Sequence, residues 1–381
     1  MSFALTKEQL MIQKMARDFA RKELAPLAAE RDEKHLYPAD SLKKMGELGL
    51  LGMLVSEKYG GEDMGTVSYA LALSEIAAAC ASTAVIMSVH NSICCGSIEQ
   101  FGSEEQKQQF LVPMTAGKII GAFALTEPEA GSDAQSLTCS AVKEGDSYII
   151  NGTKRFITSG KNGGVVILLA RTGETGTEGI TAFLITHDLP GFNVDKVENK
   201  MGQCGSDTVD LVFSNCKVPA ARVLGKEGEG FIVAMSGLDA GRIGIAALSV
   251  GIAQAALEEA VKYSKQRKQF GQEIAKFQGL QWIMADMAMD VEAARLLVLN
   301  AAAIKERGEN CIMAASMAKC FASEMVNRVT AQAIQIHGGY GYIKEYAVER
   351  FYRDARVLTI YEGTNQIQRH VIARELLKTK K

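Results

Sequence analysis

Near its C-terminus the chain reads "IYEGTNQ" from Ile360 to Gln366, and this segment carries one acidic side chain, Glu362. A single carboxylate in so short a turn can accept a proton if the fold holds it against a substrate. Gly363 allows the backbone to approach a bound molecule closely. Thr364 has the type and position of an N-cap for a last helix, where Glu362 would only favour the helix dipole. The residues alone leave both roles open, and the two roles are compatible.

Two further segments have residue types that suit a ligand. In "FALTEPEAGSD", residues 123–133, a short strand runs into a loop with Thr126, Gly131 and Ser132. Backbone and hydroxyl groups there can bond the edge of a flat heterocycle, although pattern alone favours an ordinary strand-to-turn connection. Arg267 lies where one predicted helix gives way to the next, and a guanidinium suits phosphate because it binds the oxygens bidentately. A solvated helix end is the commoner position for such a charge.

Composition excludes several classes of function. The 381 residues predict two or three domains, and 47% hydrophobic with 23% charged residues is typical of a globular protein. A net charge of −2 gives no reason to expect nucleic acid, and neither a signal peptide nor a membrane-inserted segment is predicted. The eight cysteines form no CxxC pair, so we expect no metal site and reduced thiols. The absence of GxGxxG and GxxxxGK[ST] argues against a Rossmann or P-loop cradle.

The elements that must position these residues fall into three zones. The predicted domains are an α-helical domain at 1–117, a β domain at 118–222 and a helical bundle at 223–381. The predicted fold class is mainly α with a central antiparallel β domain. In the last zone the predicted helices span 229–265, 277–307, 311–336, 346–356 and 365–378. Their number and length suggest a four-helix bundle.

Local patterns support these zones. Thr6 and Gln9 have the spacing of a capping box at the start of the first helix. The Ala-rich, almost uncharged stretch 69–95 predicts one helix that is buried on most sides. In the second zone, "SAVKEGDSYIINGTKRFIT" predicts two strands around a turn at Gly145 and Asp146.

Five segments occur in order at the spacing of one known family. They are "FALTEPEAGSD", "NGTKRFITSG", "RKQFGQEIAKFQ", "QIHGGYGY" and "RDARVLTIYEGTNQIQ". Together they resemble the acyl-CoA dehydrogenases, flavoproteins that oxidise fatty acyl-CoA thioesters, and the resemblance covers essentially the whole chain. "LDAGRIGIA" and "MSVHNS" are most similar to the short-chain, or butyryl-CoA, branch. The fold implied is an N-terminal helical domain, a β domain and a C-terminal four-helix bundle.

The resemblance implies that FAD is the cofactor and that scattered residues hold it. The residues implied to line the flavin, from two facing strands, are Phe123, Leu125, Thr126, Ser132, Phe156 and Thr158. The family usually has Trp where this chain has Phe156, which keeps an aromatic wall but lacks the indole donor. The residues implied to reach the FAD of a neighbouring subunit or its phosphate and adenine end are Arg267, Gln269, Phe270, Gln278, Gln335, Gly338 and Gly339. Thr364 and Gln366 are implied to touch FAD from the C-terminal turn. Without the family, Gly338 and Gly339 resemble a helix C-cap.

The resemblance also gives the lone acid of the C-terminal turn a role. It implies that Glu362 is the catalytic base, which removes the α proton of the thioester while the β hydrogen leaves as hydride to flavin N5. Burial beside an apolar substrate would raise the pKa of Glu362 toward the working pH. Its backbone N–H, with a flavin ribityl hydroxyl, would hold the thioester carbonyl. The residues implied to contact the substrate are Ser132, Asp239, Arg242, Tyr361 and Gly363.

Some branches of the family carry the base on another helix, directly before the arginine of "LDAGRIG". That position is Gly241 in this chain, so no second carboxylate competes with Glu362. Without the family, Asp239 and Arg242 have the spacing of an i,i+3 ion pair on one helix.

The implied activity is dehydrogenation of a short-chain acyl-CoA to a trans-2-enoyl-CoA, with an electron-transfer flavoprotein as acceptor, in a homotetramer built as a dimer of dimers. No mitochondrial presequence is visible, which suggests a bacterial cytoplasmic protein or a mature mitochondrial matrix form. Branched, alicyclic or aryl-propenoyl CoA substrates and a reductase direction stay open, because residues 88–92, with His90 and Asn91, do not define the pocket. The presence of Glu362 and Arg267 disfavours a non-catalytic acyl-CoA-binding paralogue.

Overall fold

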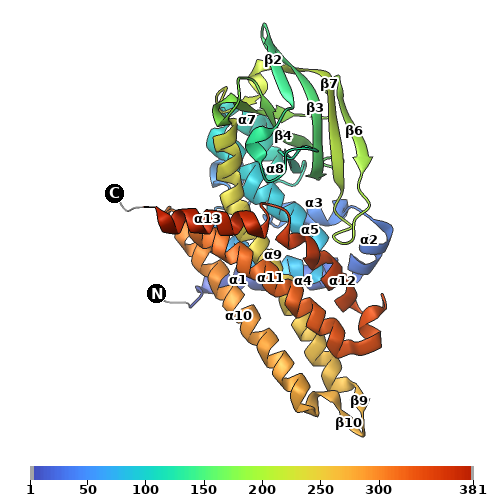
Figure 1. Cartoon of the computed structure of the whole chain (residues 1–381). Helices are drawn as coiled ribbons and strands as arrows, with labels where there is room; N and C mark the ends of the chain where they lie inside the picture. The colour runs from blue at the N-terminus through green and yellow to red at the C-terminus, as the bar shows by residue number, and fades with distance from the viewer. Residues whose placement is uncertain (1–3, 379–381) are drawn as a thin grey trace.

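Helices form both ends of the chain, and a sheet lies between them in sequence (Figure 1). The structure is a computed structural model and describes residues 4–378. The N-terminal helices are α1 (Lys7–Phe19), α2 (Ala28–Lys34), α3 (Ala39–Glu47), α4 (Gly65–Ala79), α5 (Ala81–Ser88), α6 (Gly96–Phe101), α7 (Glu104–Gln106) and α8 (Val112–Thr115). Three π-helical segments extend them: η1 (Ala20–Leu24), η4 (Val89–Cys95) and η5 (Lys107–Leu111). The predicted capping box of Thr6 and Gln9 opens α1.

The stretch predicted as one buried helix is interrupted, so that prediction is wrong in its continuity. α4 ends at Cys80, whose backbone is extended (φ −154°, ψ 101°), and α5 begins at the next residue. The Ser82 hydroxyl in the first turn of α5 accepts a hydrogen bond from the Gly205 N–H of the β domain at 3.2 Å. The break therefore coincides with a contact between domains, and a contact so distant in sequence leaves no local signal.

The central sheet is mixed rather than purely antiparallel as predicted. Its strands are β1 (Gly121–Ala124), β2 (Ser140–Glu144), β3 (Ser147–Thr158), β4 (Val165–Arg171), β5 (Ile180–Ile185), β6 (Phe192–Val197), β7 (Thr208–Pro219) and β8 (Val223–Leu224). The order is β6-β7-β3-β2-β4-β5-β8, and β1 pairs with β4. Both β1 and β2 run parallel to β4. For β1 this is possible because the strand enters from the helical domain and no hairpin turn joins it to β4. The hairpin of β2 and β3 forms as predicted.

Strand β4 joins the sheet to the helices. Val165, Ile167 and Leu169 belong to the core shared with the helical domains, whereas Val166 and Leu168 belong to a second core on the other face of the sheet. This alternation buries β4 on both faces, as its continuous apolar sequence requires. Since β1 lies beside β4, the strand that carries the predicted flavin residues is fixed against the helices.

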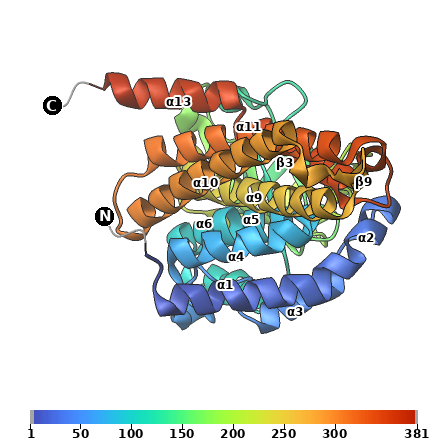
Figure 2. The ribbon, with the colours of Figure 1, turned by 90° about the horizontal axis from the view of Figure 1, so that it is seen from below.

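The C-terminal domain begins with α9 (Gly230–Gln266), a long helix at the centre of the molecule. A small hairpin, β9 (Lys268–Gln269) and β10 (Gln272–Glu273), leads to α10 (Gln278–Glu306), α11 (Ile312–His337), α12 (Ala347–Ala355) and α13 (Asn365–Leu377). All five helices match the predicted ranges to within one residue at each end. Figure 2 shows α4 between α1 and α9, with α10, α11 and then α13 beyond. α9 is the one helix within residues 4–378 that is long and apolar enough to cross a membrane, but 67% of that window is buried inside the fold.

Candidate functional site

The turn that carries Glu362 has an unusual backbone. Glu362 has a φ of 50° and Gly363 a φ of 86°, so two successive residues take left-handed conformations. The amide of Gln368 donates to both of their carbonyl oxygens, at 3.1 and 3.0 Å. Thr364 caps α13 as predicted, because its side chain accepts from the Ile367 N–H. The start of α13, the Gln368 amide and Gly363 thus hold Glu362 in a backbone conformation that most residues avoid.

The Glu362 carboxylate is buried and unpaired. Neither of its oxygens has a hydrogen-bond partner within the described part of the chain. Burial raises the pKa of Glu362 to about 7, against the opposing effects of the Lys319 and Arg242 charges. A carboxyl group poised near neutrality and free of hydrogen bonds is suited to take a proton from a substrate.

Gly241 on α9 makes room for this carboxylate. A Cβ atom at position 241 would lie 2.2 Å from Glu362 Oε2 and 3.3 Å from Ile93 Cδ1. The position where other branches of the resembled family carry the base therefore points at the same place as the Glu362 side chain. A side chain at position 241 would therefore compete for the space that the Glu362 carboxylate occupies.

Arg242, the next residue, lies close enough to Glu362 for its charge to lower the pKa of that carboxyl, and its predicted contact with a substrate stays a prediction. It is buried and donates to Asp239 at 2.6 Å, so the ion pair with i,i+3 spacing also forms. The Arg242 Nε is buried with no partner among residues 4–378. Burial raises the pKa of Asp239, and the Arg242 charge opposes this.

Tyr361 links the Glu362 turn to the β domain through Gln203, a residue that the sequence analysis did not single out. The Gln203 amide, from the loop between β6 and β7, donates to the Tyr361 hydroxyl at 3.2 Å and to the Asp354 carbonyl at 3.1 Å. The Gln203 N–H also donates to the Asp354 carboxylate, and burial raises the pKa of Asp354 to about 6. Gln203 has a φ of 52°, which holds its side chain across the domain boundary. Nothing local in the sequence distinguishes this glutamine.

The residues predicted to face the flavin gather where β1 ends and β3 bulges. The Thr126 carbonyl accepts from the Arg155 N–H at 2.8 Å, and the Leu125 carbonyl accepts from Lys154 Nζ at 3.0 Å. The register of β3 against β7 shifts between Lys154 and Ile157, and Phe156 in this bulge has a φ of 60°. Its side chain is 58% exposed, so the ring stands out from the sheet as a wall for a ligand.

The other members of this group lie around the same bulge. Phe123 is half-buried on β1, and Thr158 ends β3 opposite Thr208. Ser132 is exposed in the loop that follows β1. One residue further along β3, the Ser159 N–H donates to the Asp207 carbonyl at 3.1 Å, in the loop that also carries Gln203. The flavin-facing group and the Glu362 turn are therefore joined through one loop.

A buried ion pair supports the residues predicted to face the flavin, and the sequence analysis did not single it out. Lys154 Nζ lies 2.7 Å from the Glu127 carboxylate, and both side chains are almost fully buried. Glu127 also accepts from the backbone of Thr138 and Cys139. Burial alone would raise the pKa of Glu127, but the Lys154 charge and these donors lower it overall. Because Glu127 holds the Lys154 ammonium in place, Lys154 in turn fixes the position of the Leu125 carbonyl oxygen.

The residues predicted for the far end of FAD line a second site. A groove of about 620 Å³ is lined by Arg267, Gln269, Phe270, Gln335, Gly338 and Gly339, among others. Gln278, the first residue of α10, is exposed but does not line this groove. A Cβ atom at Gly338 or Gly339 would meet nothing within 4 Å, so a ligand has open access to this backbone. The guanidinium of Arg267 lies 5.4 Å from the centre of the Tyr340 ring.

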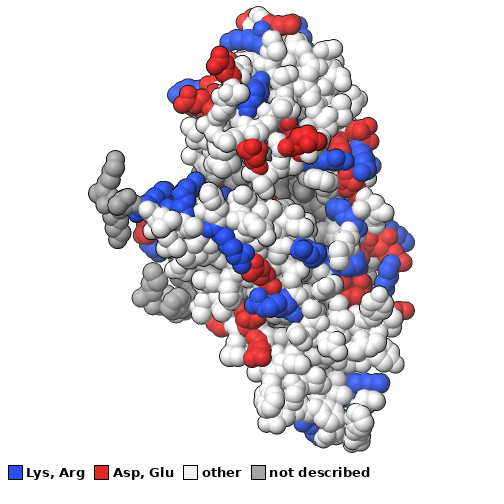
Figure 3. All heavy atoms as spheres, in the orientation of Figure 1, with Lys and Arg blue, Asp and Glu red and all other residues white. Residues whose placement is uncertain are grey.

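The structure keeps these two groups of predicted FAD residues apart within one chain. The β9–β10 hairpin marks the lower tip of the bundle in Figure 1, and β3 lies in the sheet at the upper end. The surface of the lower bundle carries few charged side chains in Figure 3. Phe270, Trp282 and Tyr342 are 93%, 62% and 87% exposed there. The remaining residues predicted to touch FAD, Thr364 and Gln366, belong to neither group. They lie at the start of α13, beside Glu362.

Comparison with known proteins identifies the family. Three family models match the chain: the N-terminal domain of acyl-CoA dehydrogenase at 6–118, the middle domain at 122–216 and the C-terminal domain at 228–377. The short-chain specific acyl-CoA dehydrogenase of Clostridium acetobutylicum is 47% identical over 99% of this chain and 100% of its own length. The chain belongs to the acyl-CoA dehydrogenase family, whose members are flavoprotein oxidoreductases of fatty acid β-oxidation.

Two solved structures have the same fold over the whole chain. Butyryl-CoA dehydrogenase from Megasphaera elsdenii superposes with a TM-score of 0.97 at 47% identity, covering 99% of this chain and 100% of that one. A chain described with the electron transferring flavoprotein of Acidaminococcus fermentans, in work on flavin-based electron bifurcation, gives 0.98 at 49% identity over 100% of both chains. The three-domain fold predicted from the sequence is confirmed. Within residues 4–378, no group of three His, Cys, Asp or Glu side chains is arranged to hold a metal ion.

Proposed function

We propose that the protein dehydrogenates short-chain acyl-CoA thioesters with FAD and that Glu362 removes the α proton. One observation carries this proposal: the Glu362 carboxylate is buried, has no hydrogen-bond partner among residues 4–378 and has a pKa raised to about 7. A carboxylate in this state has a proton affinity matched to neutral pH and no internal group that satisfies it. Similarity to relatives named for short-chain substrates supports the chain length.

The chain's own residues divide the work of proton removal. Glu362 approaches from the turn before α13, and Gly241 leaves the space in which its carboxylate moves. Within the described residues the Glu362 N–H makes no hydrogen bond, so it is available to the thioester carbonyl. A donor at that oxygen stabilises the enolate-like charge that develops as the α proton leaves. Arg242 and Lys319 place positive charge beside the same carboxylate.

The arrangement of the side chains fits FAD as the cofactor. When bound, FAD supplies the hydride acceptor at flavin N5. Residues at the β3 bulge, with Phe156 as a wall, would hold the flavin, and the groove with Arg267 would hold the phosphate and adenine end of an FAD. Since these sites lie at opposite ends of one chain, each FAD would need residues of two chains. This separation supports the predicted homotetramer, and the relative described with an electron transferring flavoprotein supports that partner.

The test is anaerobic bleaching of the flavin absorbance with CoA thioesters of graded chain length. We expect fast reduction by butyryl-CoA and slower reduction as the chain lengthens. Glu362→Gln keeps the size and most polar contacts but cannot take the proton. This variant should still bind butyryl-CoA and show a perturbed flavin spectrum. Its flavin should be reduced roughly 10²–10⁴-fold more slowly than that of the native protein. Reduction of the Gln variant at the native rate would refute the assignment.

Further thioesters in the same assay separate the alternatives. Branched, alicyclic and aryl-propanoyl CoA each replace butyryl-CoA in turn, and the fastest substrate defines the class. The reductase direction is tested by mixing the reduced enzyme with crotonyl-CoA and following reoxidation. Colourless protein that takes up no FAD on reconstitution would exclude every one of these activities.

A further inference from the structure

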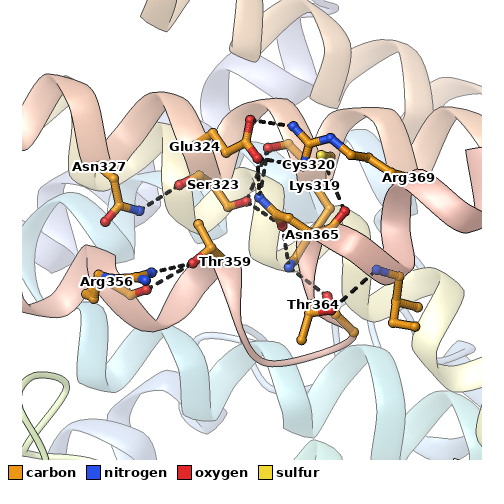
Figure 4. A network of polar contacts seen from close by, with 12 residues as sticks. Lys319, Cys320, Ser323, Glu324, Asn327, Arg356, Thr359, Thr364, Asn365 and Arg369 are labelled. Carbon is orange, nitrogen blue, oxygen red and sulfur yellow. Dashed lines mark hydrogen bonds and ion pairs between the residues drawn. The ribbon is translucent and has the colours of Figure 1, made fainter. Parts of the chain in front are cut away.

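Lys319 is a fully buried lysine that points from α11 into the Glu362 turn. Its ammonium donates to the Gly363 carbonyl at 2.8 Å and to Asn365 Oδ1 at 2.9 Å. Figure 4 shows the Lys319 side chain reaching from α11 toward Thr364 and Asn365, at the start of α13. Both acceptors lie within three residues of Glu362, so the lysine anchors this turn to α11.

A hydrogen-bond network fixes the end of this anchor. Asn365 accepts from the Ser323 hydroxyl at 3.1 Å and donates to the Cys320 carbonyl and the Glu324 carboxylate. Glu324 in turn pairs with Arg369 at 2.7 Å near the surface. The network runs between α11 and α13, with Lys319 at its inner end and Arg369 at its outer end (Figure 4).

The charge of Lys319 has no carboxylate partner in direct contact. Within residues 4–378 it forms no ion pair, whereas Arg242 on α9 is paired with Asp239 at 2.6 Å. Burial lowers the pKa of Lys319 to about 8, and the charge of Glu362 is the largest effect that opposes this lowering. Of the charged groups around Lys319, Glu362 is therefore the one that most favours its ammonium form.

The remaining titratable groups around Glu362 are neutral at pH 7. Burial raises the pKa of Tyr69 on α4, of Cys94 in η4 and of the adjacent Tyr361, and Glu362 adds to each of these shifts. Lys319 and Arg242 both lower the pKa of Glu362, and the Lys319 charge has the larger effect although it lacks an ion-pair partner among residues 4–378.

We propose that Lys319 is a positioning residue for the base: it anchors the Glu362 turn through Gly363 and Asn365, and its positive charge favours the ionised form of the carboxylate. The inference rests on the proposed function and adds the group that makes the base usable. A buried ammonium is costly unless it is hydrogen-bonded and balanced by a negative charge, and the Glu362 turn provides both.

The experiment compares the pH dependence of flavin reduction in four variants. Lys319→Met removes the charge and keeps much of the volume, and Lys319→Gln is the second neutral variant if the first does not fold. Asn365→Ala keeps the charge and removes one acceptor of the anchor. Arg369→Ala is the control, because it cuts only the outer end of the network. Reduction by saturating butyryl-CoA is followed by anaerobic stopped flow in all of them.

The expected results separate charge from anchoring. In Lys319→Met the midpoint of the acid limb rises by about 1–3 pH units, since an opposite charge close to a carboxylate lowers its pKa by that amount. In Asn365→Ala the limiting rate at high pH falls while the midpoint stays. Arg369→Ala changes neither. An unchanged midpoint in both neutral Lys319 variants overturns the inference.

An infrared titration without substrate separates this failure from failure of the proposed function. The carboxyl band that Glu362→Gln removes reports the protonation of Glu362 directly. If that band titrates near pH 7 in the native protein and does not move in Lys319→Met, only the role of Lys319 is refuted. If Glu362→Gln reduces flavin at the native rate, the proposed function itself is refuted.

Discussion

The substitution Gly241→Ala adds a single methyl group next to the Glu362 carboxylate. In Gly241→Ala the new Cβ would lie 2.2 Å from Glu362 Oε2 and 3.1 Å from its Cδ. An unstrained contact between such atoms needs roughly 3.3 Å, so the carboxylate must move by about 1 Å. The side chain of Glu362 is flexible enough to yield, but Ile93 limits the room on the other side, at 3.3 Å from the same Cβ. The fold should therefore survive, with the base displaced.

A displacement of about 1 Å at a reacting group costs about 10²-fold in rate. We expect Gly241→Ala to bind FAD and butyryl-CoA normally and to reduce its flavin about 10²-fold more slowly in anaerobic stopped flow. Gly279→Ala is the matched control, because Gly279 is also helical and a Cβ there would meet nothing within 4 Å. A native rate of flavin reduction in Gly241→Ala would refute the idea that a side chain at position 241 displaces the Glu362 carboxylate.

The same geometry predicts a rescue. Adding Gly241→Glu to Glu362→Gln places a carboxylate at the point that the native base occupies, and some turnover should return. Gly241→Gln in the same background is the control, because it adds the same volume without a base. Equal rates in the two double variants would contradict the reasoning.

Further predictions follow from other parts of the site. If Glu362 is the base, it acts in its ionised form, and its pKa is raised to about 7, so reduction should slow as pH falls through 7; a flat profile between about pH 5 and pH 9 would contradict this role. Arg267→Ala should weaken both FAD retention and subunit assembly, by about 1.5–3 kcal/mol for a lost charge-assisted contact, as measured by FAD titration and sedimentation. Glu127→Gln leaves the Lys154 ammonium buried without its counter-charge and should lower the free energy of unfolding by about 3–5 kcal/mol; denaturation that shows a loss under about 1 kcal/mol would argue against the pair.

Local sequence signals were sufficient for the helices of the C-terminal domain. α9, α10 and α11 are long helical stretches bounded by short links, so their approximate ends could be predicted although no side chain of their N-cap residues caps them. β6 was missed because only Phe192 among its residues is buried, so no apolar run marks it. Cys80 carries no Gly or Pro signal, and the break there coincides with a contact to Gly205 in another domain.

The candidate site likewise contains residues that the sequence marks and residues that it does not. Glu362, Thr364 and the flavin-facing segments stand out in the sequence because each is a short motif. Gln203 and Lys319 do not, because they act on the C-terminal turn from 158 and 44 residues away, respectively. A buried lysine looks like any helical lysine until its neighbours are known. Residues that support a site through long-range contacts therefore need the structure.

The left-handed backbone at Phe156, Phe270 and Glu362 has a consequence for engineering. A non-glycine residue in this conformation costs of order 1 kcal/mol or more, and all three occur among the residues proposed to serve FAD or substrate. A campaign that selects variants for heat resistance would find glycine or asparagine favourable at these three positions. It would then enrich well-folded proteins that have lost the flavin wall, the exposed ring of the groove or the base. A library designed for stability should keep these three codons fixed and vary the rest of the surface.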